Sequence, residues 1–166
     1  MFVFSLRANK KRVILMAVLL VSIALGLFLT RNSDLPVTDD SGVSLKAADA
    51  EQRVAFLSQF GWEIDEDPVQ VEEIVIPAEF DETYEKYNEI QLAQNMDLST
   101  YAGKTAKKWT YTVKNYPGYE TENSCIRANL IVFDGAVVGG DISSLEQGGF
   151  MQGFDFPVQQ PQKVNN

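Results

Sequence analysis

An uninterrupted apolar segment near the N-terminus constrains this chain more than any other feature of its sequence. Val13–Thr30 reads VILMAVLLVSIALGLFLT, 18 residues without a charged side chain. As a helix it would span about 27 Å, which is just enough to cross the hydrocarbon core of a bilayer. Leu27, Phe28 and Leu29 run directly into Thr30 and Arg31, without the small-x-small site that a cleaved signal peptide needs. We therefore predict an uncleaved transmembrane signal anchor over residues 13–30.

The distribution of charge predicts which side of the membrane each part occupies. Four basic residues lie in segment 1–12, whereas Arg31 alone follows the apolar segment closely. This asymmetry favours a cytoplasmic N-terminus and an extracytoplasmic remainder in a single-pass protein of the cell membrane. All 23 acidic residues but only ten of the 14 basic ones follow Thr30. An acidic external segment repels nucleic acid, so we expect no nucleic-acid partner.

Composition divides the external part into three segments. Residues 31–46 are polar and rich in Asp and Ser, as is typical of a tether, and residues 157–166 have the low apolar content of a disordered tail. Residues 47–156 remain as one extracytoplasmic domain. The lone Cys125 cannot form a disulfide within the chain, so the domain must fold without one. Cys125 is interpreted as a partly buried small side chain, with intermolecular pairing or thiol reactivity as alternatives.

Hydrophobic periodicity and capping residues predict two helices and a sheet. Asp49 is positioned to cap a helix that ends at Phe60 before Gly61, and a second helix is expected over 79–94. A strand is expected over 67–77, with a bulge near Glu72 and Glu73 because its valines and isoleucines are out of phase. A capped turn over 97–103 then precedes three meandering strands. The predicted fold is α+β, a small antiparallel sheet of about four strands with both helices packed on one side.

The stretch VFDGAVVGGD, residues 132–141, has three glycines after an apolar strand. It lacks the spacing of a phosphate-binding loop, and β-type residues follow Gly135, so Asp134-Gly135 indicates a hairpin turn. A regular two-residue hairpin would turn Asp141 inward without a partner. A bulge at Gly139 and Gly140 would instead turn Asp141 outward beside Arg127. We prefer the bulge, while an inward Asp141 would become the leading site candidate.

The absence of histidine excludes many common active sites. No Ser-His-Asp or Cys-His arrangement and no imidazole metal ligand is available in a chain without His. Carboxylate chemistry remains, and the least implausible pair for it is Asp141 with Glu146. The acids of EIDED, Glu63, Asp65 and Asp67, form a weak candidate for Ca²⁺, because the ordered spacing and glycine of an EF-hand loop are missing. No cofactor is expected.

Aromatic side chains supply the candidates for a ligand-binding or partner-binding surface. Tyr116 and Tyr119 lie in the predicted loop before the second strand of the meander, and Phe150 and Phe154 lie among glycines near the end of the domain. The alternative is that these rings only shape a loop and close the edge of the sheet.

Three stretches together resemble a known family. RVAFLSQFGWEID, IPAEFDETYEKYNEIQLAQNMDLSTYAGK and RANLIVFDGAVVGGDISSLEQGGFMQGF are similar to an uncharacterised family of membrane-anchored proteins from clostridial-type Gram-positive bacteria. The family is defined only by a domain of unknown function, and the resemblance covers residues 50–155. It implies a single N-terminal anchor and an extracytoplasmic domain, and it implies no activity, cofactor or partner.

These observations favour a non-catalytic binding domain displayed outside the membrane, with a cell-envelope protein or glycan as its ligand. The alternative is a carboxylate-dependent hydrolase acting on cell-wall glycans. In a third interpretation the membrane segment Val13–Thr30 itself carries the function, by assembling with other membrane proteins. The sequence identifies neither the ligand nor the oligomeric state.

Overall fold

The computed structural model describes residues 42–119 and 125–157. The predicted anchor, the tether up to residue 41 and the tail from residue 158 lie outside these ranges. Within the described ranges, no helix is both long enough and apolar enough to span a membrane. The described residues belong to one compact unit.

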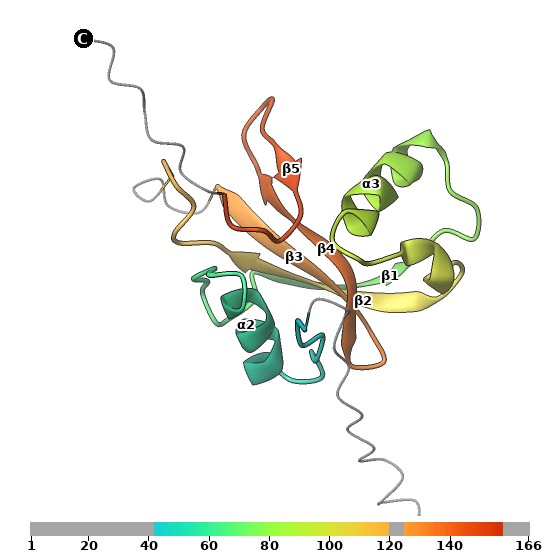
Figure 1. Cartoon of the computed structure of the whole chain (residues 1–166), viewed down its shortest axis with the longest axis horizontal. Helices are drawn as coiled ribbons and strands as arrows, with labels where there is room; N and C mark the ends of the chain where they lie inside the picture. The colour runs from blue at the N-terminus through green and yellow to red at the C-terminus, as the bar shows by residue number, and fades with distance from the viewer. Residues whose placement is uncertain (1–41, 120–124, 158–166) are drawn as a thin grey trace, which may run out of the picture. The chain divides into compact units, whose positions relative to one another are not determined.

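A five-stranded antiparallel sheet forms the centre of the domain (Figure 1). Its strands pair in the order in which they occur along the chain, so the sheet is a simple meander. The α+β class and the antiparallel sheet are thus confirmed, with one short additional strand at the end. The strands are β1 (Gln70–Val75), β2 (Thr105–Thr112), β3 (Ile126–Phe133), β4 (Ala136–Ser144) and β5 (Met151–Gln152).

Capping side chains determine where the helices begin. Helix α2 (Ala50–Ser58) begins after Asp49, whose carboxylate accepts a hydrogen bond from the backbone N–H of Gln52, as predicted. Helix α3 (Glu82–Leu92) begins three residues later than expected because Asp81 is its cap. Asp97 caps the short 3₁₀ helix η1 (Leu98–Tyr101).

The two helices pack on opposite faces of the sheet, which corrects the prediction that both lie on one side (Figure 1). The reason is visible in β3, whose residues are buried on both faces. Leu130 belongs to the core under α2, which also contains Phe56 and Leu57, whereas its neighbour Ile131 belongs to the core beside α3. A strand that is buried on both faces needs a covering element on each.

The predicted bulge in β1 is wrong. The strand pairs with β2 without interruption from Gln70 opposite Thr110 to Val75 opposite Thr105. The apolar residues that seemed out of phase divide between the two faces, so that Ile74 packs beside α3 while Val71 and Val75 remain exposed. β1 is an edge strand with one face only partly covered, so exposed valines are tolerated there.

The hairpin between β3 and β4 confirms the predicted turn. Asp134 and Gly135 have φ values of 48° and 80°, the left-handed conformation that a two-residue turn requires. The register shifts between Ile131 and Val132, so a bulge is present at Val138, directly before Gly139 and Gly140, where it was expected. It places Ile142 opposite Ala128 in the core, as expected.

The expected position of Asp141 is wrong, however. Asp141 lies opposite Asn129, not beside Arg127, and only 3% of it is exposed. The bulge puts Asp141 on the α3 face of the sheet, and that face is itself partly covered. Asp141 therefore points away from the α2 core but is still buried.

The end of the predicted tether pairs with the sheet. The backbone N–H of Val137 donates to the carbonyl of Leu45, and that of Ala47 donates to the carbonyl of Gly135. Val43 and Leu45 also pack against the core under α2. The packed domain thus includes residues from about 43 onward.

Candidate functional site

A row of polar residues crosses four strands on the α3 face. The register places Gln70 opposite Thr110, Thr110 opposite Asn129, and Asn129 opposite Asp141. Thr110, Asn129 and Asp141 are all less than 10% exposed. Because directly opposite residues in an antiparallel sheet have neighbouring side chains, this row brings four polar side chains next to one another.

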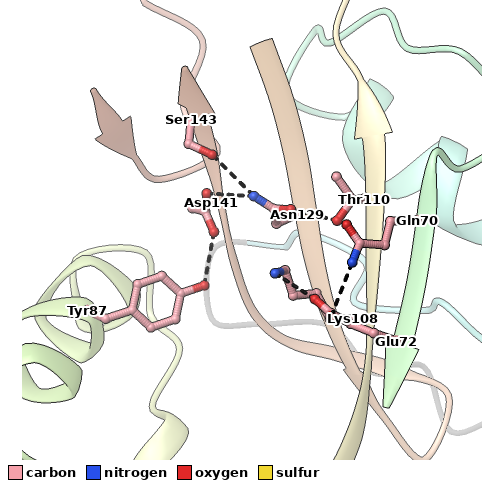
Figure 2. A network of polar contacts seen from close by, with 8 residues as sticks. All are labelled: Gln70, Glu72, Tyr87, Lys108, Thr110, Asn129, Asp141 and Ser143. Atoms are coloured by element: carbon pink, nitrogen blue, oxygen red, sulfur yellow. Dashed lines mark hydrogen bonds and ion pairs between the residues drawn. The ribbon is translucent and has the colours of Figure 1, made fainter. Parts of the chain in front are cut away.

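Asp141 lies at one end of the row and accepts hydrogen bonds from neutral donors (Figure 2). The Tyr87 hydroxyl, from α3, donates to Oδ2 over 3.0 Å, and Asn129 Nδ2 donates to Oδ1 over 2.9 Å. Asn129 is oriented in turn by Thr110, whose hydroxyl donates to Asn129 Oδ1 over 2.8 Å. Asn129 Nδ2 also donates to the Ser143 hydroxyl over 3.2 Å. Four elements therefore fix the position of one carboxylate.

A separate ion pair lies beside the polar row, toward the edge strand. Lys108 Nζ lies 2.9 Å from Glu72 Oε1, and Gln70 Nε2 donates to the other carboxylate oxygen of Glu72 over 3.3 Å (Figure 2). Both members of the ion pair are roughly one-third exposed. Exposed pairs of this kind contribute little to stability, so their charges are available to a ligand.

A cavity of about 320 Å³ lies over the polar network. Its polar lining comes from the side chains of Tyr84, Tyr87, Lys108, Asn129 and Asp141. Its apolar lining comes from Ile74, Val75, Ile131 and Met151. The volume falls at the small end of the range for small-molecule sites, which commonly combine apolar walls with a few fixed polar groups.

Two glutamines of the α3 region hold Gly140, the residue before Asp141 in β4. Gln91 Oε1 accepts a hydrogen bond of 2.8 Å from the backbone N–H of Gly140, and Gln94 Nε2 donates to the Gly140 carbonyl over 3.0 Å. These bonds satisfy both the N–H and the carbonyl of Gly140. A Cβ at Gly140 would lie 2.1 Å from the Asn129 carbonyl oxygen, so only glycine fits there.

Burial changes the protonation equilibria at the site. It raises the pKa of Asp141 above its ordinary value, although hydrogen bonds from Asn129 and Tyr87 and the charge of Lys108 act in the opposite direction. Burial also raises the pKa of Tyr87 well above its usual range, and the adjacent Asp141 adds to this shift. Tyr87 is therefore a neutral hydrogen-bond donor at physiological pH.

The proposed catalytic pair is not brought together. Glu146 follows β4, is exposed, and accepts a hydrogen bond of 3.1 Å from the Tyr119 hydroxyl. It does not line the cavity that contains Asp141. Another carboxylate on the same face of the sheet is that of Glu72, whose partner Lys108 lines the cavity, and sequence reasoning missed it.

The acidic loop does not form a metal site. Asp65 makes an ion pair of 2.7 Å with Lys114, and Glu63 and Asp67 are exposed. Across residues 42–119 and 125–157, no three His, Cys, Asp or Glu side chains are grouped so as to hold a metal ion.

The aromatic candidates separate into one core residue and one cluster. Phe154 is fully buried and packs edge-on against Phe56 with ring centroids 5.0 Å apart, so it cannot belong to a binding surface. Tyr116, Tyr119 and Phe150 are half-buried and contact one another, with Tyr116 and Phe150 stacked at 4.7 Å. Tyr116 also stacks on Trp62. These three rings extend the core under α2 to the surface.

Sequence reasoning finds Asp141 but misses its partners. Tyr87 falls in the apolar row of its helix, and Asn129 is hidden inside an apolar strand. The available signal is the polar alternation of Lys108, Thr110 and Thr112 in β2, which marks a sheet face that is not purely apolar.

Comparison with known proteins identifies the family of this chain. The family model "Domain of unknown function (DUF4830)" matches residues 56–142, more than half of the chain. The chain therefore belongs to the DUF4830 family. The matched segment includes Tyr87, Lys108, Asn129 and Asp141. Neither the search of curated proteins nor that of solved structures found a match.

Proposed function

We propose that this protein is a single-pass membrane protein whose extracytoplasmic domain binds a cell-envelope glycan at the Asp141 cavity, without catalysis. The observation that carries the proposal is the cavity itself, in which a fixed carboxylate, a phenol, an amide and an ammonium group face one space beside apolar side chains. Sugars present hydroxyl groups together with apolar ring faces, and they need this combination of partners.

The arrangement around Asp141 favours binding over catalysis. Both carboxylate oxygens accept hydrogen bonds from neutral side chains that are themselves fixed by the sheet and by α3. Such a group is held rigidly for recognition, because a preorganised polar group loses little freedom when it binds. The chain also contains no histidine that could act as a general acid or base.

The alternative function, a carboxylate-dependent glycan hydrolase, is supported by one observation. The raised pKa of Asp141 is the property that a general acid requires. Its second carboxylate would be Glu72, which already forms an ion pair with Lys108 and does not line the Asp141 cavity. Binding does not require a second carboxylate, so we rank the binding function above the hydrolase.

Titration of the purified protein with soluble cell-wall glycan fragments tests the proposed site. Tyr87→Phe removes the hydroxyl that fixes Asp141, and we expect it to weaken glycan binding about two- to tenfold, as the loss of one hydrogen bond would. Tyr101→Phe is the matched control, since Tyr101 is also half-buried beside α3 but does not line the cavity. Equal affinities for the two variants would contradict the site, and release of cleaved fragments would support the hydrolase.

The membrane anchor and orientation are tested separately in cells. We expect the protein to fractionate with membranes and its domain to be degraded by protease added outside intact cells after removal of the wall. Replacing Val13–Thr30 by an unrelated membrane span should preserve glycan binding. Loss of function after that replacement would instead assign the activity to the membrane segment.

A further inference from the structure

A second cavity, of about 430 Å³, lies on the opposite face of the sheet from Asp141. Arg53 of α2, Trp109 and Lys107 of β2, and Asp134 of the β3–β4 turn contribute to its lining. It shares no lining residue with the Asp141 cavity. Its chemistry therefore has to be explained independently of the proposed glycan site.

Arg53 is the unusual residue of this cavity, since only 5% of it is exposed. Its Nε donates a hydrogen bond of 2.8 Å to the Tyr111 hydroxyl, and Nη1 donates one of 3.2 Å to the Ala47 carbonyl. The guanidinium carbon lies 3.5 Å from the centroid of the Trp109 ring. All these partners are neutral, and no ion pair of Arg53 is present in the described part of the chain.

A buried cation without a counter-ion is costly, because desolvation is not compensated by a nearby opposite charge. A guanidinium carries five N–H donors, and the two hydrogen bonds of Arg53 leave its second terminal nitrogen, Nη2, without a protein acceptor among the described residues. Every fully buried side-chain nitrogen in the described residues has a hydrogen-bond partner. Nη2 has none, so it is not fully buried and reaches accessible surface. Because Arg53 lines the cavity, these free donors are open to a ligand.

We infer that the Arg53 cavity binds the carboxylate of a small organic acid that carries a single negative charge and an apolar body. The planar guanidinium matches the two oxygens of a carboxylate, and stacking on Trp109 fixes its plane. Ala48, Val132 and the Trp109 ring provide apolar contacts for the rest of the molecule.

The charges around the cavity select a monoanion over a dianion. Lys107 adds a second cation to the lining, but Glu73 and Asp134 contribute two carboxylates. The lining is thus balanced overall, which allows one carboxylate to pair with Arg53 and disfavours the higher charge of phosphate.

Titration of the full-length protein in neutral detergent with benzoate, followed by tryptophan fluorescence, tests this inference. The chain has two tryptophans, and Trp62 is buried away from this cavity, so a saturable change reports on Trp109. We expect saturation below about 10 mM and clearly weaker binding of inorganic phosphate. No saturable change with benzoate, or tighter binding of phosphate, would overturn the inference.

Three variants separate a specific site from a general effect of charge. Arg53→Lys keeps the charge but loses the two-pronged geometry, and we expect it to weaken benzoate binding at least tenfold. Lys107→Glu leaves Arg53 intact and should weaken binding about threefold to fivefold, whereas Lys104→Glu, with the same change in charge outside the cavity, should leave it unchanged. Equal weakening by the two glutamate variants would mean that only overall charge matters and would contradict a specific site.

Discussion

The two faces of the sheet consist of alternate residues of the same strands, yet they bury different chemistry. The α2 face holds a large apolar core with several aromatic rings and a single buried cation, Arg53, among the described residues. The α3 face has a smaller apolar core beside a polar row that ends at a buried acid, Asp141. We infer that the α2 face supplies most of the stability, while the α3 face gives up apolar contact to build a polar cavity.

Gly140 is the position at which the two faces depend on each other, so its replacement should have the largest effect. A Cβ there would lie 2.1 Å from the Asn129 carbonyl oxygen and 2.5 Å from the Phe154 ring. We expect Gly140→Ala to cost more than about 4 kcal/mol, or to prevent folding, because backbone on one side and core on the other must move. The free energy of unfolding, measured in urea, checks this.

Gly148→Ala is the matched control for that substitution. Gly148 also has a positive φ, of 77°, but no described atom lies within 4 Å of the position that an added methyl group would take. The cost should therefore be only the conformational one, about 1 kcal/mol. Similar losses at Gly140 and Gly148 would show that Gly140 does not connect the two faces.

Removing apolar volume from the α2 face should have the next largest effect. Leu130 is fully buried under α2. We expect Leu130→Ala to lower the free energy of unfolding by about 2–5 kcal/mol, because it removes apolar contact and leaves a cavity. Thermal and urea denaturation of the variant measure this loss.

The neighbouring residue on the other face should cost less. Asn129→Ala leaves Thr110 and Asp141 without their shared partner. Because the cavity allows water to replace part of those hydrogen bonds, we expect a loss of about 1–3 kcal/mol. A loss equal to that of Leu130→Ala would contradict the inference that the α2 face supplies most of the stability.

Much of the local structure is predictable because it depends on residues that are close in sequence. Asp49 and Asp97 cap their helices as expected, and Asp134-Gly135 makes the expected hairpin, since each signal acts within four residues. The meander follows from the short connections between successive strands. A bulge in β4 is also predictable from its two adjacent glycines, although the extra residue is Val138, just before them.

The faces and the site could not be predicted, since both depend on the registers of several strands at once. A doubly buried strand such as β3 does not reveal which helix covers which side. The polar row exists only because Thr110, Asn129 and Asp141 fall opposite one another across three strands. Its closure by Tyr87 depends on where α3 is placed, and no local pattern encodes that.

The smallest and most selective prediction concerns the pH dependence of the polar row. Burial raises the pKa of Asp141 in the folded state, so the folded protein holds this proton more tightly than the unfolded chain does. The contribution of Asp141 to stability is therefore full below its ordinary pKa and falls as pH rises through the raised value. Asp141→Asn keeps the shape without the charge, and we expect its stability relative to the original protein to increase with pH over that window.

Asp97→Asn should show the opposite sign and so sharpens the comparison. Hydrogen bonds from Ser99 and Asn88 lower the pKa of Asp97, which means that its stabilising contribution is present above its ordinary pKa and is lost as pH falls through the lowered value. We expect Asp97→Asn to be less stable than the original protein at neutral pH and to approach it in acid. Urea denaturation of both variants across the acidic range gives the two slopes. If the two slopes have the same sign, the charge of Asp141 does not lower the stability of the folded protein. Asp141 would then not be a functional group that the α3 face keeps at the expense of stability.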